Sequence, residues 1–318
     1  MIWLPDATVD HLIAVAGWPE FTSDRYEVIE EIGRGGMGTV YSARDHALGR
    51  EVAIKIGNAL PSAELQARLT SEAKVLARLE HPGIVPVHDF GILADGRPFY
   101  VMKRVQGRTL QACIESGLPL ADRLRIFERI CEAVGFAHAH GILHRDLKPD
   151  NVMVGTFGEV MVMDWGVARV PDEAPDAEGT RMGTPGFMAP EQAEHAGRAD
   201  ERADVYALGA ILSMLVTGDA PPPDAPLAVQ HLNRASGVAP PLRSICRVAL
   251  APAPEDRYQT VARLADDVAR FREDQAVSVH REGLVERARR FVRTYEMPIL
   301  LVLAYIIMRA VIAVFVRI

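Results

Sequence analysis

The stretch of sequence that decides the fold is HRDLKPDN, residues 144–151, which is followed by DWG at residues 164–166, 13 positions after Asn151. The segment before it, Asp122–His140, carries apolar residues at helical spacing along one face. Further helical patterns and proline-dense loops follow on its C-terminal side. The sequence therefore predicts a mostly α-helical unit over residues 106–275, with both motifs in its first half.

The part of the chain before this unit has the pattern of a sheet. Its strand-like segments are short, apolar and separated by glycine-rich turns. In chain order they are Tyr26–Ile32, Thr39–Arg44, Glu51–Ile56, Ile84–Ile92 and Pro98–Val105. Residues 62–79 instead have helical spacing, between Pro61 and Pro82. We therefore predict an α+β protein in which a small lobe, residues 25–105, has five antiparallel strands and one main helix.

The composition is that of a folded protein kept under reducing conditions. Of the 318 residues, 49% are hydrophobic and 24% are charged, and the length suggests two compact units. The three cysteines are widely separated and odd in number, which argues against a disulfide framework and against a zinc ribbon. The net charge is −7, and it is unevenly distributed: the chain outside a basic C-terminal tail is strongly acidic, which argues against broad nucleic-acid binding.

A glycine-rich segment, GRGGMGTV at residues 33–40, lies between the first two predicted strands. Glycines there let backbone N–H groups approach phosphate oxygens closely. The same spacing marks dinucleotide-binding folds, but those place a helix after the glycines and an acidic residue about 20 positions on. Because a strand follows here, we favour a loop that covers phosphates between two strands of a sheet.

Lys55 ends the tetrapeptide VAIK, residues 52–55, inside an apolar strand. A buried ammonium group is costly without an anionic partner, and Glu72, in the helix that follows, is a suitable one. On its own, the tetrapeptide is also compatible with a surface lysine at a strand edge. The other motifs of the chain favour the buried lysine.

These motifs, together with APE at residues 189–191, resemble the protein kinase superfamily, and specifically the bacterial eukaryotic-like (Hanks-type) serine/threonine kinases, over about Tyr26–Asp274. The resemblance implies the bilobal protein kinase fold. It also implies transfer of the γ-phosphate of ATP, with Mg²⁺ or Mn²⁺, to serine and threonine hydroxyls of proteins, autophosphorylation included. Lys148 and Thr184 are typical of serine/threonine rather than tyrosine kinases.

The resemblance implies a role for each site residue. Asp146 would accept the proton of the substrate hydroxyl, and Lys148 would steady the γ-phosphate. Lys55, held by Glu72, would bind the α- and β-phosphates. The nucleotide-binding residues would be Ile32, Gly33, Arg34, Gly35, Gly36, Met37, Gly38, Val40, Ala53, Lys55, Met102, Lys103 and Val105. The metal ligands would be Asn151 and Asp164, and the substrate-binding turn would contain Thr184. The structural residues would be Glu191 and Arg257, which would form a buried ion pair between the activation segment and the large lobe, and Asp204, which would hold the catalytic loop in place.

Two departures from the family pattern affect the expected site. Trp165 stands where the family more often has phenylalanine, and we expect its larger ring to pack beneath the metal-binding aspartate. Lys103 and Arg104 replace the acidic residue often found at the hinge after Met102, the expected gatekeeper, but adenine binding uses backbone groups there. The proline-rich stretch 218–241 is shorter than the family's helical insertion, so no substrate docking is inferred from it.

Three histidines, His138, His140 and His144, superficially suggest a metal cluster. Two of them lie at a predicted helix end, and the third belongs to the HRD motif. We therefore disfavour a zinc site.

Arg145 precedes the catalytic aspartate, an arrangement that in the family often couples activity to a phosphorylated activation segment. Between Asp164 and Glu191 the hydroxyl-bearing residues are Thr180 and Thr184. We predict Thr180 as an autophosphorylation site. The alternative is that acidic side chains supply the negative charge directly. These are Asp172, Glu173, Asp176 and Glu178.

Residues 297–316 form an overwhelmingly apolar run of the length that spans a bilayer, interrupted by Arg309. The sequence predicts a transmembrane helix, with a helix in the membrane interface or one packed on a soluble domain as alternatives. Residues 280–318 hold seven arginines against three glutamates, a net charge of +4 that leaves −11 for the rest. The basic juxtamembrane segment, 276–296, predicts a single-pass protein of the cytoplasmic membrane with its kinase domain in the cytoplasm.

The expected order along the chain is an N-terminal extension (1–24), the catalytic domain (25–275), the basic segment and the membrane helix. Two functions fit this order: an active, membrane-tethered signalling kinase, and a catalytically inactive kinase-fold scaffold at the membrane. We favour the enzyme because the four residues that inactive kinases usually lose are present. These are Lys55, Asp146, Asn151 and Asp164. The expected partners are protein substrates and the bilayer, with a homodimer or a membrane-protein partner, the latter through Arg309, as further hypotheses.

Overall fold

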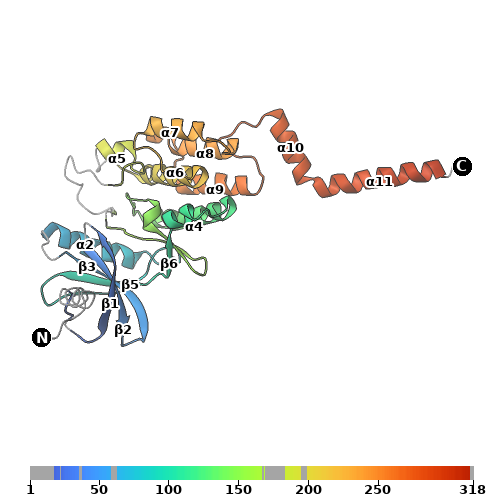
Figure 1. Ribbon diagram of the computed structural model, residues 1–318. Coiled ribbons are helices and arrows are strands. Elements are labelled where there is room, and N and C mark those ends of the chain that lie inside the picture. Colours follow the sequence, from blue (N-terminus) through green and yellow to red (C-terminus); the bar gives the residue numbers. More distant parts are fainter. Residues whose placement is uncertain are drawn as a thin grey trace, which may run out of the picture.

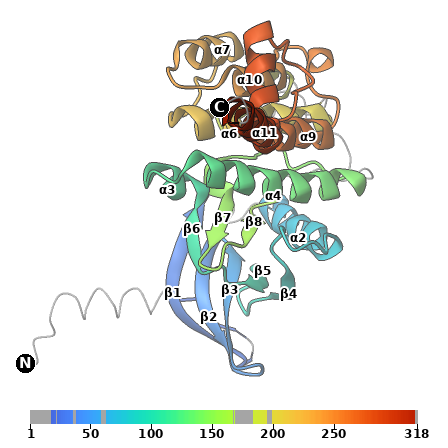
Figure 2. The ribbon, with the colours of Figure 1, turned by 90° about the vertical axis from the view of Figure 1, so that its right-hand side faces the viewer.

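The computed structural model describes residues 18–315, apart from residues 22, 36–37, 59–62, 167, 169–182 and 195–198. A β-sheet and one helix form a small lobe at one end of the molecule, and a helical lobe adjoins it (Figure 1). Helix α4 (Leu120–Ala139) runs across the molecule between the small lobe and the other helices of the large lobe (Figure 2). This arrangement confirms the predicted bilobal α+β fold.

The small lobe is built on an antiparallel sheet whose strands lie in the order β1-β2-β3-β5-β4. The strands are β1 (Tyr26–Gly35), β2 (Gly38–Asp45), β3 (Arg50–Gly57), β4 (Val87–Ile92) and β5 (Pro98–Lys103). The five predicted strands are therefore confirmed. Ile84, expected at the start of the fourth strand, instead forms an isolated bridge with Val162 of the large lobe.

The two faces of this sheet are covered by different parts of the chain. Helix α2 (Ala63–Arg78) covers one face, where its Leu69 and Leu76 are buried in the same apolar cluster as Met102 of β5. On the other face, Phe21 packs edge-to-face on Phe99, with 5.1 Å between ring centroids. Part of the N-terminal extension thus belongs to the packing of the small lobe.

The large lobe contains a short sheet and a set of helices packed around α6. In chain order its elements are β6 (Gly107–Thr109), α3 (Leu110–Glu115), α4, η1 (Pro149–Asn151), β7 (Val152–Gly155), β8 (Val160–Val162), α5 (Pro190–Glu194), α6 (Glu201–Thr217), α7 (Ala225–Arg234), α8 (Pro240–Ala249), η3 (Pro254–Asp256) and α9 (Val261–Arg272). Every residue of α6 from Ala203 to Leu215 is buried, as expected of a helix that is apolar all round.

The proline-rich stretch after α6 starts as the loop that the sequence predicts over Asp219–Pro226, but α7 begins inside this range, at Ala225. Helix α7 begins directly after Asp224, whose carboxylate accepts a hydrogen bond from the N–H of Leu227. Pro226 lies in its first turn, where the missing N–H has no helical partner to lose. Helix α8 also begins at a proline, Pro240, but without a side-chain cap. The prolines therefore mark the starts of helices.

The chain beyond α9 stays attached to the large lobe before it leaves. Val277 is buried in the core of this lobe. Asp267 of α9 accepts hydrogen bonds from the backbone N–H and the hydroxyl of Ser278, at 2.8 and 2.7 Å. Helices α10 (Leu284–Thr294) and α11 (Glu296–Phe315) follow, and α11 projects away from both lobes (Figure 1).

Helix α11 coincides with the predicted membrane span to within a residue at each end. Among the residues that the structure describes, however, no helix is both long enough and apolar enough to cross a membrane. The predicted span over residues 297–316 is therefore not supported by the structure.

Candidate active site

Asp204, in the first turn of α6, fixes the backbone of the HRD motif. Its carboxylate accepts hydrogen bonds from the N–H groups of His144 and Arg145, each at 2.8 Å. The ring of His138 bonds the same carboxylate, also at 2.8 Å. Arg145 has a φ of 66°, an unfavourable conformation for a residue with a Cβ, and these bonds hold it in place. The contact implied for Asp204 is present.

The charges of Asp204 and His138 stabilise the hydrogen bond between them. Burial opposes ionisation of Asp204, but the hydrogen bond and the charge of His138 outweigh it and lower the pKa of Asp204. Burial also opposes protonation of His138, yet its bond to Asp204 raises the pKa of His138 above 6.5. The two side chains therefore favour an imidazolium–carboxylate pair inside the lobe.

Asp146 lies at the centre of a polar cluster in the large lobe. Thr184 donates its hydroxyl hydrogen bond to one carboxylate oxygen of Asp146 at 2.8 Å. The Nζ of Lys148 lies 2.9 Å from the oxygen of Thr184 and 3.2 Å from the other carboxylate oxygen. Asn151 donates from Nδ2 to the backbone oxygen and to Oδ2 of Asp146, at 2.8 and 3.3 Å. The structure thus brings together four of the site residues expected from the sequence.

Lys55 of β3 connects the two lobes. Its Nζ donates to both carboxylate oxygens of Glu72 on α2 and to Oδ1 of Asp164, each at 2.8 Å. Lys55 and Glu72 are buried, whereas the side chain of Asp164 is 46% exposed. The ammonium group therefore lies at the inner end of a site that opens to solvent at Asp164, and a surface lysine is excluded.

The three charged groups set one another's protonation. Burial would lower the pKa of Lys55, but the negative charges of Glu72 and Asp164 raise it well above its ordinary value. Burial likewise opposes ionisation of Asp164, yet the charge and hydrogen bond of Lys55 lower the pKa of this carboxyl group. Asp164 also has a φ of 57°, which side chains with a Cβ seldom adopt. A charged lysine and an ionised, half-exposed carboxylate thus meet at one point.

Trp165 fills the space next to this point. Its side chain is buried, and its Nε1 donates to the backbone oxygen of Val162 at 3.3 Å. The indole packs on the ring of His144, with 4.5 Å between centroids. The close packing expected of the larger ring is therefore found.

The expected nucleotide-binding residues lie on the strands of the small lobe. Ala53 of β3 is directly opposite Met102 of β5, and both are buried. A Cβ at Gly38 would lie 2.2 Å from the backbone oxygen of Ile56, so only glycine lets β2 lie this close to β3. Of the remaining residues, Ile32, Gly33, Arg34 and Gly35 are on β1, Val40 is on β2, and Lys103 and Val105 are at and just beyond the end of β5. Gly36 and Met37 lie outside the described residues.

Glu191 and Arg257 form a two-pronged ion pair in the large lobe. Both nitrogen–oxygen distances are 2.7 Å, and the arginine side chain is fully buried. The same guanidinium group also donates to the backbone oxygen of Arg202 at 2.9 Å. The pair ties the start of α5 to the loop before α9, which is the structural contact that the resemblance implied.

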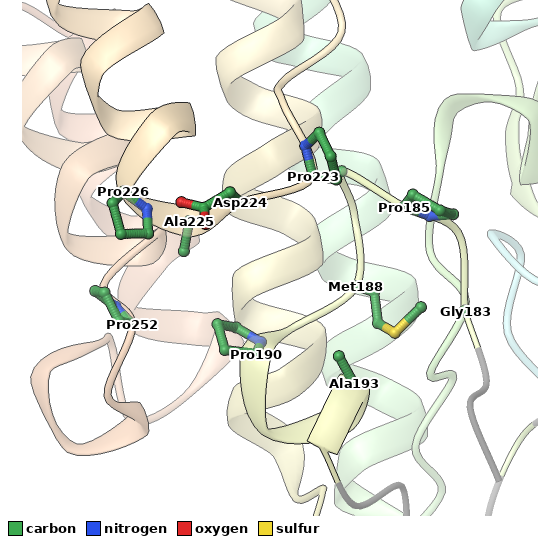
Figure 3. Close-up of a pocket in the computed structure, with 11 residues that line it drawn as sticks. Gly183, Pro185, Met188, Pro190, Ala193, Pro223, Asp224, Ala225, Pro226 and Pro252 are labelled. Atoms are coloured by element: carbon green, nitrogen blue, oxygen red, sulfur yellow. The ribbon is translucent and has the colours of Figure 1, made fainter. Parts of the chain in front are cut away.

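An apolar groove begins beside Thr184, the threonine bonded to Asp146. It is lined by Gly183, Pro185, Gly186, Met188, Pro190, Ala193, Pro223, Asp224, Ala225, Pro226 and Pro252. Figure 3 shows that residues after Thr184 form one side of it and that the residues around the start of α7 form the other. Asp224 is the charged residue in this lining.

Two residues of the site were not expected from the sequence. Tyr100 donates a hydrogen bond to Glu72 at 2.9 Å, and His138 bonds Asp204. The pairing register of β3 and β5 is the signal that identifies Tyr100, because it places this tyrosine opposite Lys55.

Thr180 lies outside the described residues. Within the part of the chain that the structure describes, no group of three or more His, Cys, Asp and Glu side chains is arranged to hold a metal ion.

Comparison with known proteins shows which protein family this chain is similar to. The family model of the protein kinase domain matches residues 26–272. The serine/threonine-protein kinase PknB of Mycolicibacterium smegmatis is 39% identical over 281 residues, which cover 81% of this chain and 44% of that protein. PknB of Mycobacterium tuberculosis is 37% identical over 273 residues, or 79% and 44%. PknD of Chlamydia caviae is 36% identical over 288 residues, or 77% and 31%.

The chain spans less than half the length of these relatives, and the match lies over both lobes. The family model alone extends over well more than half of the chain. The chain therefore belongs to the protein kinase domain family, among the bacterial Hanks-type kinases that its motifs resemble.

Proposed function

We propose that this chain is an ATP-dependent serine/threonine protein kinase, which transfers the γ-phosphate of ATP to hydroxyl groups of proteins, itself included. The observation that carries the proposal is the threonine hydroxyl already bonded to Asp146: Thr184 donates to this carboxylate at 2.8 Å. A serine or threonine hydroxyl of a substrate protein has the same chemistry and fits the same acceptor. The names of the relatives, each a serine/threonine-protein kinase, support this choice of acceptor.

The residues around Asp146 can carry out the transfer. As the acceptor oxygen bonds to the γ-phosphorus, its proton passes to the carboxylate of Asp146. The bond between the γ-phosphorus and the oxygen that bridges it to the β-phosphate breaks, and ADP leaves. Lys148, 3.2 Å from Asp146, supplies positive charge where the γ-phosphate must lie. Lys55, whose raised pKa keeps it protonated, would bind the phosphates nearer the nucleoside.

Asp164 and Asn151 fit a magnesium ion. Both offer oxygen ligands of the kind that Mg²⁺ prefers, and the lowered pKa of Asp164 keeps its carboxylate ionised. The two bonds from Asn151 to Asp146 fix the orientation of its amide. When bound, Mg²⁺ neutralises charge on the phosphates of ATP, and Mn²⁺ takes the same ligands.

The apolar groove beside Thr184 is where the substrate segment next to the acceptor residue would lie. Met188 and Pro185 offer it apolar contacts, and Asp224 offers a negative charge. An apolar residue close to the acceptor, with a basic residue near it, suits this lining best. The sequence alone supported no inference about docking at the proline-rich stretch, and the proposal rests on the lining of this groove.

The test of the kinase proposal is to map the phosphate that the full chain transfers. The chain is incubated with Mg-ATP and a generic basic protein, and both proteins are analysed by mass spectrometry. We expect phosphoserine and phosphothreonine, and none in Asp146→Asn, which keeps the size of the side chain but cannot take the proton. Phosphotyrosine, or equal labelling by the variant, would contradict the proposal. Nucleotide binding without any transfer would instead favour the catalytically inactive scaffold.

The same mass spectra address the regulation that the sequence predicts. We propose that Thr180 is phosphorylated by the enzyme itself and that the phosphate acts through Arg145. Fully active enzyme with an unmodified Thr180 would overturn this part and favour the acidic residues around it. The kinase proposal does not depend on the outcome.

We further propose that the chain is attached to the cytoplasmic membrane through α11, with its two lobes in the cytoplasm. The large apolar side chains described along α11 are exposed, for example Met297 at 68%, Leu301 at 67% and Ile307 at 62%. Apolar surface of this extent favours a lipid or protein cover. The arginines of the segment 276–296 favour the cytoplasmic side, where anionic lipids lie.

A flotation experiment tests the attachment. The full chain is mixed with vesicles of phosphatidylcholine and phosphatidylglycerol and centrifuged through a density gradient. We expect it to float, to resist a high-salt wash and to be released by detergent. The double variant Leu301→Glu/Ile307→Glu should stay at the bottom, whereas Leu48→Glu, at a 61% exposed site in the small lobe, should float. Wild-type protein that stays at the bottom, or leaves in salt, would contradict insertion. A separate pulldown tests whether Arg309 binds a membrane-protein partner. The proteins that co-purify with the wild-type chain are compared with those that co-purify with Arg309→Leu, and an unchanged set would contradict a partner at Arg309.

A further inference from the structure

Tyr100 lies directly opposite Lys55 in the register of β5 and β3. Side chains of directly opposed residues in antiparallel strands stand on the same face of the sheet, about 5 Å apart at Cβ. Here that face is the one that α2 covers. Tyr100 is 2% exposed, so its hydroxyl is held inside the lobe next to the ammonium group of Lys55.

Both of these side chains bind the same carboxylate. Glu72, which is 1% exposed, accepts hydrogen bonds from Nζ of Lys55 on both oxygens, at 2.8 Å each. The hydroxyl of Tyr100 donates a third bond, at 2.9 Å, to Oε1. Burial and the charge of Glu72 raise the pKa of Tyr100 well above its ordinary value, so the phenol remains protonated and keeps donating. The position of Glu72 is thus defined from two neighbouring strands.

Lys55 alone would not hold the Glu72 carboxylate in one position. Its ammonium group is shared with Asp164 of the large lobe, at 2.8 Å. The phosphates of ATP would compete for the same ammonium group, because they are stronger acceptors with more charge. The bond from Tyr100 comes from the sheet itself and does not change when Lys55 changes partners. A buried carboxylate that loses one donor is therefore still held by the other.

We propose that Tyr100 is a positioning residue for phosphate transfer, which holds Glu72, and through it Lys55, in the place from which Lys55 binds ATP. The proposal rests on the proposed kinase function and assigns Tyr100 no contact with substrate. It deepens that function by naming what keeps the lysine in position while its partners exchange.

The test compares Tyr100→Phe with the wild-type full chain. The variant keeps the ring and loses the hydroxyl alone. We expect kcat, expressed per nucleotide-binding site titrated with a non-hydrolysable ATP analogue and Mg²⁺, to fall about 3- to 10-fold, with KM for ATP changed less than about twofold. Normalising by binding sites removes any loss that comes from unfolded protein.

A matched control is available in the large lobe. Tyr258 is likewise buried, and its hydroxyl donates to the carboxylate of Asp267 at 2.8 Å. Tyr258→Phe removes a bond of the same kind away from the site. It should lower the free energy of unfolding and leave kcat per binding site unchanged.

A double-mutant cycle separates positioning from general packing. If Tyr100 acts through Glu72, then Tyr100→Phe should cause little further loss of kcat in a Glu72→Gln background. An unchanged kcat in Tyr100→Phe, or the same fold-loss in both backgrounds, would overturn the proposal while leaving the kinase function intact. Wild-type chain that transfers no phosphate would overturn the function, and this proposal with it.

Discussion

Two buried carboxylates hold the candidate site, and they hold it in different ways. Asp204 bonds the backbone N–H groups of His144 and Arg145 within its own lobe. Glu72 bonds the side chains of Lys55 and Tyr100 across the gap between α2 and the sheet. Backbone groups keep their place once the lobe has folded, whereas a lysine ammonium can exchange partners. The catalytic loop is therefore fixed by folding, while the lysine depends on the position of α2.

The largest effect expected from this difference is on stability. Asp204→Ala leaves His138 as a buried charge without its carboxylate and two backbone N–H groups without their acceptor. We expect the free energy of unfolding to fall by about 3–5 kcal/mol. Urea unfolding measures it.

Asp200→Ala on the same helix is the control for Asp204→Ala. Asp200 caps α6 by accepting from the N–H of Arg202 at 2.9 Å, and its loss should cost about 1 kcal/mol. If both variants lose the same free energy, the hydrogen bonds of Asp204 to His138, His144 and Arg145 contribute no more than an ordinary helix cap.

The second effect is expected on catalysis rather than on stability. Glu72→Gln keeps the shape of the side chain and removes the charge that binds Lys55. We expect kcat/KM for ATP to fall about 30- to 100-fold, the scale of one or two charge-assisted hydrogen bonds. The free energy of unfolding should fall by less than it does in Asp204→Ala.

Glu51→Gln is the matched control, on β3, the strand that also carries Lys55. Glu51 pairs with Arg104 at 2.6 Å, but both side chains are partly exposed, and such pairs contribute little. Its kcat/KM should equal that of the wild type. A loss in Glu51→Gln similar to that in Glu72→Gln would show that the effect is general and not specific to the lysine.

The third effect depends on pH and tests the ion pair between His138 and Asp204. Because the pKa of His138 in the folded state is raised above its ordinary 6.5, the protonated ring stabilises the fold. This contribution is fully present below pH 6.5 and is lost as the pH rises through the folded-state pKa. The difference in unfolding free energy between wild type and His138→Gln should therefore be larger at about pH 5.5 than at about pH 8.5. A difference that is constant or grows with pH would contradict the ion pair.

The smallest effect is expected at Tyr206, whose hydroxyl donates to neither Asp204 nor Glu72. The hydroxyl of Tyr206 is buried and has no hydrogen-bond partner among the described residues, while the guanidinium group of Arg257 lies 5.0 Å from its ring centre. Tyr206→Phe keeps the ring and should change the unfolding free energy by less than about 0.5 kcal/mol. A larger loss would reveal a contact of this hydroxyl that the packing does not show.

Part of this site could be predicted because the types of residue along the chain indicate its chemistry. An apolar strand with one lysine requires a buried acid, and Glu72 is where that reasoning placed it. The packing of Trp165 was implied by the resemblance, in which an aromatic ring at this position packs beneath the metal-binding aspartate. Asp204, Glu191 and Arg257 could be assigned only through the resemblance, because no local pattern reveals which distant residue a buried charge meets.

The parts that escaped prediction depend on register and on helix starts. Tyr100 has the pattern of an ordinary core residue in an apolar strand, and only the pairing of β3 with β5 places it beside Lys55. His138 has the position of a histidine at a helix end, and its partner Asp204 is 66 positions away along the chain, so no local pattern indicates their contact. The prolines around α7 indicate a loop unless one knows that Asp224 caps a helix there.

The central claim is that this site moves phosphate from ATP to protein hydroxyls, and the most direct test measures both products in one tube. The full chain is given labelled Mg-ATP and a basic protein, and ADP and phosphoprotein are counted together over time. The account predicts one phosphorylated serine or threonine for each ADP formed, and neither product from Asp146→Asn, which should still bind Mg-ATP. Bound nucleotide with no phosphoprotein in the wild type, or equal transfer by the variant, would contradict it.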